Sequence, residues 1–357
     1  MKRKILLTAL AALTLASCSK ETRLSQESID NQACELTINI RSGEQRSTKA
    51  GNVYTTELDY EKAINSLQLL IFDKGGQLRH YSTVEESYGG YTKTVSMDKG
   101  EKHVWAVANC LDLSDITDED DLKAVQVKLE NNSVDEDEGF IMADSQTVDL
   151  SGSSANVTLS MRRLVGRVAL YSITNNLPAA YGALKINRVY LSNVVGNQNL
   201  MGNANPTLWY NKEGRMDETN RNSTHIIEGN KYKASCESLT FKSVNSTLSV
   251  GDVYAPEDDC IFYGMPNTSS SFPSGFHSTF SAQMTVLVVD ATINSHTYYY
   301  PVVMANGILR NCSYTVYLTI TDLGSDDPNK PVTRGDLDVT IEVSEWDTSV
   351  AAIDETI

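Results

Sequence analysis

Hydrophobic and polar residues alternate along many short stretches of the chain, a pattern typical of β-strands that bury one face. The clearest early example is segment 34–41, in which every second residue is apolar: Cys34, Leu36, Ile38 and Ile40. The residues between them are mostly polar and would face solvent. This pattern predicts a core strand close to the start of the chain. The residues that directly follow it, 42–51, are small, polar and basic, as in an exposed loop that a protease can cut.

Similar strand-like stretches recur as far as residue 346, separated by turn residues such as Asp73-Lys74-Gly75-Gly76. Segment 114–129 indicates a loop that enters a short helix or strand, and a hairpin is predicted around 151–154. Many short strands with few helical periods predict an all-β fold built from β-sandwiches. One series of strands ends and another begins near Met161, so we place a domain boundary there.

The composition fits this fold class and narrows the range of partners. The chain has 17 Tyr but only 7 Phe, and it is rich in Thr, Val, Ser and Asn, a mixture that suits strands and polar turns. Its 357 residues suffice for two domains of ordinary size. The formal net charge of −16 argues against nucleic acid and anionic membrane surfaces as partners, because like charges repel.

The first 17 residues have the features of a secretory signal. A basic start, Lys2-Arg3-Lys4, precedes an apolar run that is too short to span a bilayer. The following Leu-Ala-Ser-Cys resembles a bacterial lipobox, which implies diacylation of Cys18 and a mature chain that begins there. Lipid on Cys18 would be the only membrane attachment, since no later segment approaches ~20 apolar residues.

No motif in the sequence indicates catalysis or metal binding. The five histidines are scattered without an HExxH spacing, and the acidic runs at 115–121 and 134–139 do not match the EF-hand loop. We therefore expect no enzymatic activity, no metal and no cofactor. Five cysteines remain besides Cys18. A Cys236–Cys260 disulfide is one interpretation, and buried thiols are the other.

Several segments resemble the fimbrillin family, the type V pilins of Bacteroidia, and they occur in the order in which that family has them. They are the lipobox, the first strand with the following Arg-Ser-Thr, INSLQLLIFDKGGQL, HVWAVAN, MRRLVGRVAL, VYLSNV, FYGMPN, ILRNCSYTVYLTITDLGSDDP and a last strand that ends in Trp346. Together they extend over residues 15–346. The most specific of them is Arg310-Asn311 followed by Tyr314 and Gly324.

The resemblance implies two transthyretin-like β-sandwich domains in tandem. It divides the chain into a signal peptide (1–17), a lipidated propeptide with a removable first strand (18–46), an N-terminal sandwich (47–161) and a C-terminal sandwich with a donor-strand tail (162–357).

The resemblance also implies that an arginine-specific protease removes the first strand. Arg46 matches the cleavage position of the family best, and Arg41 and Lys49 are the alternatives. In the family, removal of this strand opens a groove, which a C-terminal segment of another subunit then fills by strand addition.

Two C-terminal segments are candidates for that donor or for a plain terminal strand. The first alternates Leu337, Val339, Ile341 and Val343 and then breaks register before Trp346. The second follows it, with a weaker alternation at Val350 and Ala352. The pattern alone leaves open which segment completes the chain's own sandwich.

The expected function is that of a structural pilus subunit supporting adhesion, located at the cell outer membrane and then in the surface-exposed fimbrium. Its partners would be other pilin subunits in a homopolymer with anchor and tip subunits, the protease, and the outer membrane through the lipid anchor before processing. A host or bacterial surface ligand would be a further partner. The alternatives are a tip adhesin of the same pilus and a glycan-binding surface lipoprotein that does not polymerise, for which Trp209-Tyr210 is the aromatic candidate.

Replacing Cys18 by serine tests the lipid anchor. Cys18→Ser should abolish labelling by a palmitate analogue and leave a precursor that retains its signal, because only the thiol accepts the diacylglyceryl group. Labelling followed in cells, with the size of the product on a gel, measures both effects. Unchanged labelling would contradict the lipobox interpretation.

Overall fold

Strands dominate this computed structural model, and the predicted all-β fold class is confirmed. The structure describes residues 33–42, 58–86, 90–202, 206–210, 226–228, 236–256, 260–269, 283–304, 306–332 and 337–346. Five residues that carry predictions lie outside the described ranges: Cys18, Arg46, Lys49, Val350 and Ala352.

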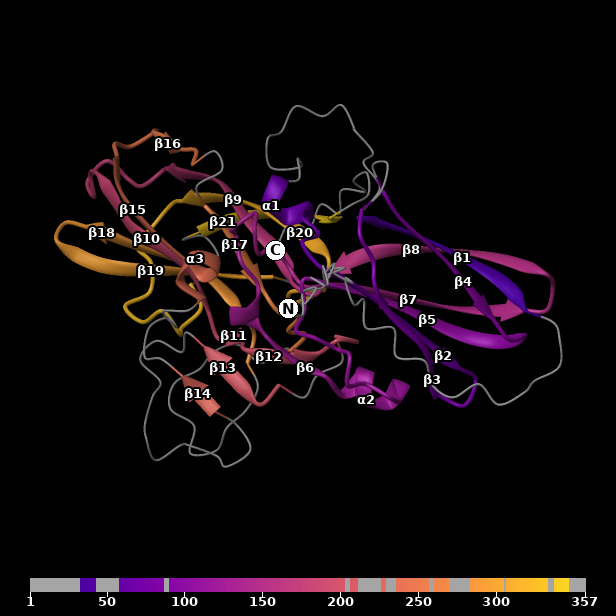
Figure 1. The fold of residues 1–357 in the computed structure, drawn as a ribbon. Coiled ribbons are helices and arrows are strands. Elements are labelled where there is room, and N and C mark those ends of the chain that lie inside the picture. The colour runs from indigo at the N-terminus through magenta and orange to yellow at the C-terminus, as the bar shows by residue number, and fades with distance from the viewer. Residues whose placement is uncertain are drawn as a thin grey trace, which may run out of the picture.

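The strands up to residue 163 form one lobe of the molecule and those from residue 166 onward form the other, except that β6 lies beside β12 of the second lobe (Figure 1). The elements of the first lobe are β1 (Cys34–Ser42), α1 (Asp59–Lys62), β2 (Leu67–Asp73), β3 (Leu78–Thr83), β4 (Tyr91–Met97), β5 (Gly100–Ala108), α2 (Glu119–Ala124), β6 (Gln126–Lys128), the 3-10 turn η2 (Leu129–Asn131), β7 (Met142–Leu150) and β8 (Ser154–Arg163).

The second lobe contains the remaining elements: β9 (Gly166–Asn175), β10 (Leu184–Ser192), β11 (Val194–Val195), β12 (Asn197–Asn199), β13 (Leu208–Tyr210), β14 (Ile226–Glu228), α3 (Glu237–Thr240), β15 (Phe241–Leu248), β16 (Val253–Tyr254), β17 (Ile261–Gly264), β18 (Val286–Ile293), β19 (His296–Val303), β20 (Cys312–Ile320) and β21 (Leu337–Glu345). The acidic segment expected to form a helix or strand forms α2 and then β6, with Asp118 as the N-cap.

The first lobe is a sandwich made from one continuous path of strands, in the order β3-β2-β5-β7-β8-β1-β4. Strands β7 and β8 pair only at Met142–Arg163 and Ala143–Arg162, so the path turns a corner there. Apolar side chains from β1, β4 and β8 on one side meet those from β2, β5 and β7 on the other in a single buried cluster. The first predicted strand therefore supplies part of this core.

The predicted hairpin around 151–154 is wrong in one respect. Residues 151–153 do join β7 to β8, but the two strands do not pair beside this connection. Instead β8 pairs in parallel with β1, from Glu35–Ser154 to Ser42–Met161. A parallel partner from a distant part of the chain leaves no local signature in the sequence. The pattern therefore could not show that β1, rather than β7, is the partner of most of β8.

The second lobe packs two sheets face to face, β15-β10-β18-β19 and β16-β9-β20-β21, with β17 also paired to β9. Most of its buried side chains belong to a cluster that continues into the first lobe through Trp105, Val107 and Phe140. Among the described strands, only β6 and β12 pair across the two lobes. Side-chain packing therefore joins the lobes, together with this short two-stranded sheet.

A buried ion pair lies at the junction of the lobes. Glu61 of α1 has no exposed surface, and the Arg167 Nε atom lies 2.9 Å from its Oε1 atom. The hydroxyl of Tyr263 donates to the same oxygen at 2.5 Å, and Arg163 Nε donates to the Glu61 backbone carbonyl. Burial, together with the Glu61 carboxylate, raises the pKa of Tyr263 well above its usual value, so Tyr263 stays a donor.

The Arg310-Asn311 motif lies at the same junction. The Arg310 guanidinium donates to the backbone carbonyls of four residues from three segments: Ala143, Arg162, Arg163 and Leu200. Asn311 has a left-handed backbone (φ 55°), and its side-chain oxygen accepts from the Arg163 amide. Burial lowers the pKa of Arg310 to about 10, so Arg310 remains charged at neutral pH. The motif thus fastens β7 and β8 to the second lobe.

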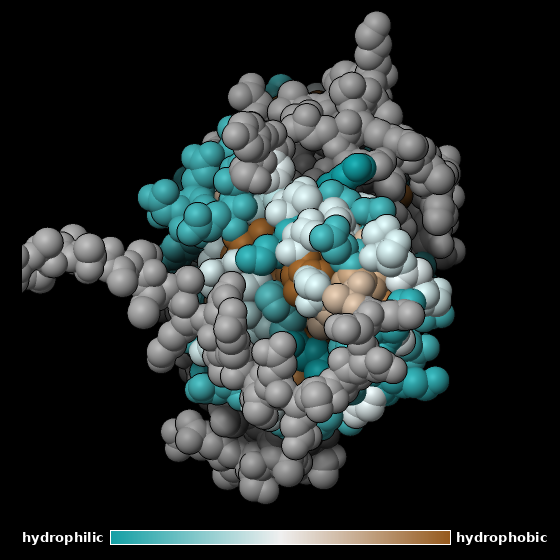
Figure 2. Space-filling view, turned by 45° about the vertical axis from the view of Figure 1, so that its right-hand side comes forward, coloured by the Kyte–Doolittle hydropathy of each residue, from teal (hydrophilic) through white to brown (hydrophobic). Residues whose placement is uncertain are grey.

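Hydrophobic residues reach the face shown in Figure 2 only as small patches among hydrophilic ones. Large exposed apolar side chains of the described residues are scattered, with Leu111 and Val253 the most exposed at 56%. No described helix has the length and apolar character that a membrane-spanning helix needs.

The Glu61 ion pair provides a test of the junction. Glu61→Gln should lower the free energy of unfolding by about 3–5 kcal/mol, because it leaves the Arg167 charge buried beside a neutral group. Asp59→Asn is the matched control on α1, since Asp59 is 72% exposed and pairs with Lys62 at the surface. Chemical unfolding of both variants measures the difference. Equal stability of the two variants would show that the buried pair does not hold the junction.

Candidate functional site

Strand β1 forms the centre of the candidate site. Its four inward side chains are completely buried or nearly so, with exposures of 0% for Cys34, Leu36 and Ile38 and 2% for Ile40. Its outward residues are polar and interact with the neighbouring strand, as in the 3.2 Å contact between the Thr37 and Thr94 hydroxyls. The alternation in the sequence therefore describes both faces of β1 correctly.

β1 is paired along both of its edges. It runs antiparallel to β4, from Cys34–Met97 to Ile40–Tyr91, and parallel to β8 on its other side. Each buried Leu or Ile contributes about 1.5–3 kcal/mol and each backbone hydrogen bond about 1 kcal/mol net. Loss of β1 would leave two unpaired strand edges and an apolar slot one strand wide, which we call the β1 slot.

The walls of the β1 slot come from the opposite layer and from β8. Among the residues of the same buried cluster are Leu69, Ile71, Val104, Ala106 and Leu159, none of which is exposed. These five residues are apolar, and Lys93 of β4, opposite Ile38, is the one charged residue that pairs with an inward residue of β1. A strand that occupies the slot must therefore present apolar side chains to this cluster at every second position.

The rim of the β1 slot is polar but uncharged. The residues that pair with the outward residues 35, 37, 39 and 41 of β1 are all serine, threonine or asparagine: Thr92, Thr94, Ser96, Ser154, Asn156, Thr158 and Ser160. Asp144 lies close to one end, where its carboxylate accepts from the Ser160 amide at 2.8 Å, and burial raises the pKa of that carboxyl. The rim can therefore accept many polar side chains and selects mainly by the apolar pattern.

The predicted cleavage residues differ in their surroundings. Arg41 belongs to β1 and is paired opposite Ser160. Arg46 and Lys49 lie outside the described residues. A protease needs its substrate segment extended and free of a sheet, and Arg41 does not meet this condition while β1 is in place.

The first candidate donor segment forms β21, the last described strand. It pairs antiparallel with β20 along its whole length, from Cys312–Glu345 to Ile320–Leu337, and lies at the edge of its sheet. Ile341 is 5% exposed, whereas Leu337, Val339 and Val343 are only partly buried. Trp346 is 7% exposed and follows the strand directly.

Other predicted features have simple structural roles. Trp209 and Tyr210 are completely buried, so they form no exposed aromatic platform for a glycan. The five cysteines of the described part form no disulfide with one another, and Cys236 and Cys260 are buried. No group of three His, Cys, Asp or Glu side chains in the described ranges is arranged to hold a metal ion.

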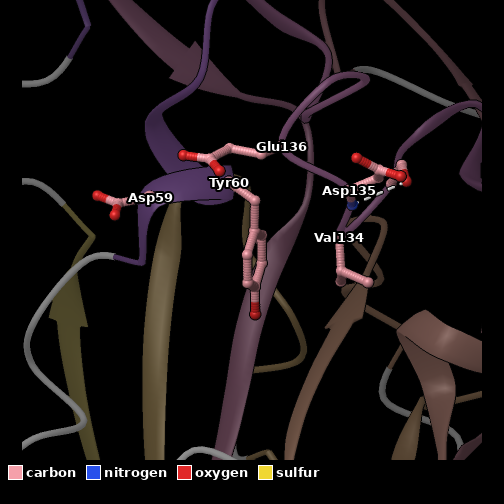
Figure 3. Close-up of a pocket in the computed structure, with 6 residues that line it drawn as sticks. Asp59, Tyr60, Val134, Asp135 and Glu136 are labelled. Atoms are coloured by element: carbon pink, nitrogen blue, oxygen red, sulfur yellow. Dashed lines mark hydrogen bonds between the residues drawn. The ribbon is translucent and has the colours of Figure 1, made fainter.

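An open hollow of about 470 Å³ lies beside α1 and is lined by acidic residues (Figure 3). Asp59, Tyr60, Asp135 and Glu136 line the hollow, and the Ser133 hydroxyl accepts from the Asp135 amide. Three carboxylates around one opening disfavour anionic ligands. The hollow is next to the junction rather than part of the β1 slot.

Sequence reasoning missed the junction residues Glu61, Arg163 and Arg167. A signal was present, because the segment MRRLVGRVAL places three arginines among apolar residues of two consecutive strands. Charges in such apolar surroundings are rarely buried without a partner. Finding Glu61 as that partner required the tertiary structure, since it lies about a hundred residues earlier in the chain.

Comparisons with known proteins agree with this architecture. Residues 34–159, which include β1 and the walls of its slot, match the family described as "Major fimbrial subunit protein (FimA)". The comparison with curated proteins gives no match.

Solved structures with a similar fold cover most of the chain. A fimbrilin (FimA) from Porphyromonas gingivalis W83 has 16% identity and a TM-score of 0.61, with 88% of this chain and 97% of that chain covered. A protein from Bacteroides eggerthii DSM 20697, titled "putative cell adhesion protein", has 17% identity and a TM-score of 0.59, with coverages of 90% and 98%. The resemblance to the fimbrillins is thereby confirmed: residues 34–159 match the FimA family, and over most of its length the chain has the fimbrillin fold.

Proposed function

We propose that this protein is a structural subunit of a cell-surface pilus that is exported as a lipoprotein, cleaved after β1 and polymerised by donor-strand exchange. The observation that carries the proposal is the position of β1. It is an internal strand of the sandwich, paired on both edges, yet it comes first in the described chain and precedes the predicted cleavage residue Arg46. A single cut would therefore detach a core strand without breaking any other strand.

Processing at Arg46 fits this arrangement better than processing at Arg41. Arg41 is paired within the sheet, so cutting there would require β1 to open first. A cut after Arg46 leaves all of β1 on the removed fragment. The junction would survive the cut, because Glu61 and its partners come later in the chain.

β21 fits the β1 slot better than the segment that follows it. β1 reads CELTINIRS and β21 reads LDVTIEVSE, so both have nine residues with apolar side chains at positions one, three, five and seven. Residues 347–357 read DTSVAAIDETI, and neither of their alternations contains four consecutive apolar residues. Because the slot buries four apolar side chains, we propose β21 as the donor.

The packing of β21 also suits a strand that transfers to a second subunit. At the edge of its own sheet, three of its four apolar side chains stay partly exposed. In the β1 slot the four corresponding positions are at most 2% exposed. For these four side chains, transfer would therefore bury more apolar surface, and it would pair both edges of the strand, which favours the donated state.

The proposed partners are other subunits of the same pilus, an arginine-specific protease, and the outer membrane through lipid on Cys18 before cleavage. A tip adhesin of the same pilus is the second candidate. The burial of Trp209 and Tyr210 removes the observation that favoured a glycan-binding surface lipoprotein. No observation here favours enzymatic activity.

Truncating β1 tests its role before and after processing. Ile38→Ala should lower the stability of the uncut precursor by about 2–5 kcal/mol, because it creates a cavity in the core. Thr37→Ala is the matched control on the outward face of the same strand and should have little effect. After cleavage both variants should match the cleaved wild type, since both substituted residues are gone. Chemical unfolding measures the stability of the wild type and of both variants, each before and after cleavage. A stability difference that persists after cleavage would show that β1 remains bound.

Disulfide trapping tests strand exchange. If Leu337–Val343 occupy positions 34–40, Thr340 takes the place of Thr37, opposite Thr94, whichever way the donor runs. Neighbouring strands place such residues about 4.5–5.5 Å apart, within reach of a disulfide. The double variant Thr94→Cys/Thr340→Cys should therefore form a ladder of covalent oligomers after cleavage, and the uncut precursor should not. Non-reducing gels show both results.

Single variants Thr94→Cys and Thr340→Cys control for the natural thiols. A ladder with Val350→Cys in place of Thr340→Cys would identify the segment after Trp346 as the donor. A cleaved protein that remains monomeric at every concentration would contradict the pilus proposal and favour a lipoprotein that does not polymerise.

A further inference from the structure

Trp346 connects the end of β21 to the junction between the lobes. Its ring stacks on Tyr263 with centroids 5.7 Å apart and an interplanar angle of 14°, and it meets Phe140 edge-on at 6.2 Å. The Arg163 guanidinium lies over the ring, with Cζ 4.6 Å from the centroid. The backbone amide of Trp346 donates to the Asn311 carbonyl at 3.0 Å. One residue at the end of the strand therefore contacts both lobes and the link between them.

These contacts add to the attachment of β21 to its own subunit. β21 has a neighbour on one edge only, and Ile341 is the one member of its apolar series that is buried. A tryptophan buries about 150–250 Å², and an arginine over the ring adds a favourable electrostatic contact. Removing β21 from its sheet requires that Trp346 first leave this pocket of side chains.

The residues around Trp346 are themselves fixed by the buried ion pair. The Tyr263 hydroxyl donates to the Glu61 carboxylate, and Arg163 donates to the Glu61 carbonyl. Two of the three side chains around the Trp346 ring are therefore positioned by α1, which is separate from β1. Cutting after Arg46 would open the β1 slot, but it would leave the contacts of Trp346 intact.

We propose that Trp346 is a latch that retains β21 on its own subunit and sets the rate at which the strand is released to another. The proposal rests on the proposed function, in which β21 is the donor. Assembly is then controlled at two separate points: β1 blocks the acceptor slot until cleavage, and Trp346 delays release of the donor. A processed subunit with an intact latch remains competent to accept a strand while it is slow to give one.

Hydrogen exchange in the uncut precursor tests the latch directly. Trp346→Ala should accelerate exchange of the amides that pair β21 with β20 by about tenfold or more, because release no longer exposes a large aromatic side chain. The β10–β18 amides should be unaffected. Leu36→Ala is the control: Leu36 is completely buried, but it belongs to the β1 cluster and not to the cluster that contains Trp346. Unchanged β21 exchange in Trp346→Ala, or equal acceleration in Leu36→Ala, would overturn the proposal.

Assembly kinetics give the second readout. After cleavage, Trp346→Ala should form oligomers about tenfold faster than the wild type, and Trp346→Phe, which keeps a ring to stack on Tyr263, should lie between them. The uncut variants should stay monomeric, because β1 still fills every slot.

Slower or unchanged assembly of Trp346→Ala would overturn the latch, since a latch can only delay release. If Trp346→Ala fails to fold, Trp346→Phe decides by the same criteria. Failure of the proposed function would look different, because the cleaved wild type itself would then never assemble.

Discussion

The N-terminal sandwich depends on the insertion of β1 between β4 and β8. This strand pairs on both edges and contributes four side chains to the core, so it is as central as any strand of the lobe. Main-chain hydrogen bonds in a sheet do not depend on side-chain identity, and the rim of the slot is uncharged. The same interaction that completes the fold can therefore be made by any strand with the right apolar alternation. β21 has that alternation.

The junction would allow the fold to tolerate the strand exchange that we propose. The two lobes are held together by Glu61, Arg167 and Arg310, none of which belongs to β1. Buried charges of this kind are costly unless each is paired, and the pairing specifies one arrangement of the lobes. Because the junction does not include β1, loss of that strand need not alter how the lobes meet. Trp346 packs onto the same junction, which links the last described strand to the stable part of the molecule.

The segments that resemble the fimbrillins acquire a physical meaning in this fold. Arg310-Asn311 binds backbone carbonyls and an amide across the junction, a role that needs a fork of donors and a residue tolerant of the left-handed backbone. Gly324 lies so close to β19 that a Cβ atom would approach the Tyr299 carbonyl oxygen to 2.6 Å. The residue type at each of these positions is therefore required by contacts between distant segments, and not by the local strand or turn in which the residue lies.

The sequence by itself determined the all-β class, the two faces of β1 and β21, and the location of the Arg310-Asn311 motif, because a period of two residues specifies which side chains share a face. It could not determine which strands are neighbours. The connection at 151–153 resembled a hairpin, yet β8 pairs with β1 beyond it, since the parallel partner is distant in the chain. Glu61, on a four-residue helix, and Trp346, just after a strand, gave no local sign of the cluster that they share. Their roles arise only where packing brings α1, β17 and the end of β21 together, and that is a property of the tertiary structure alone.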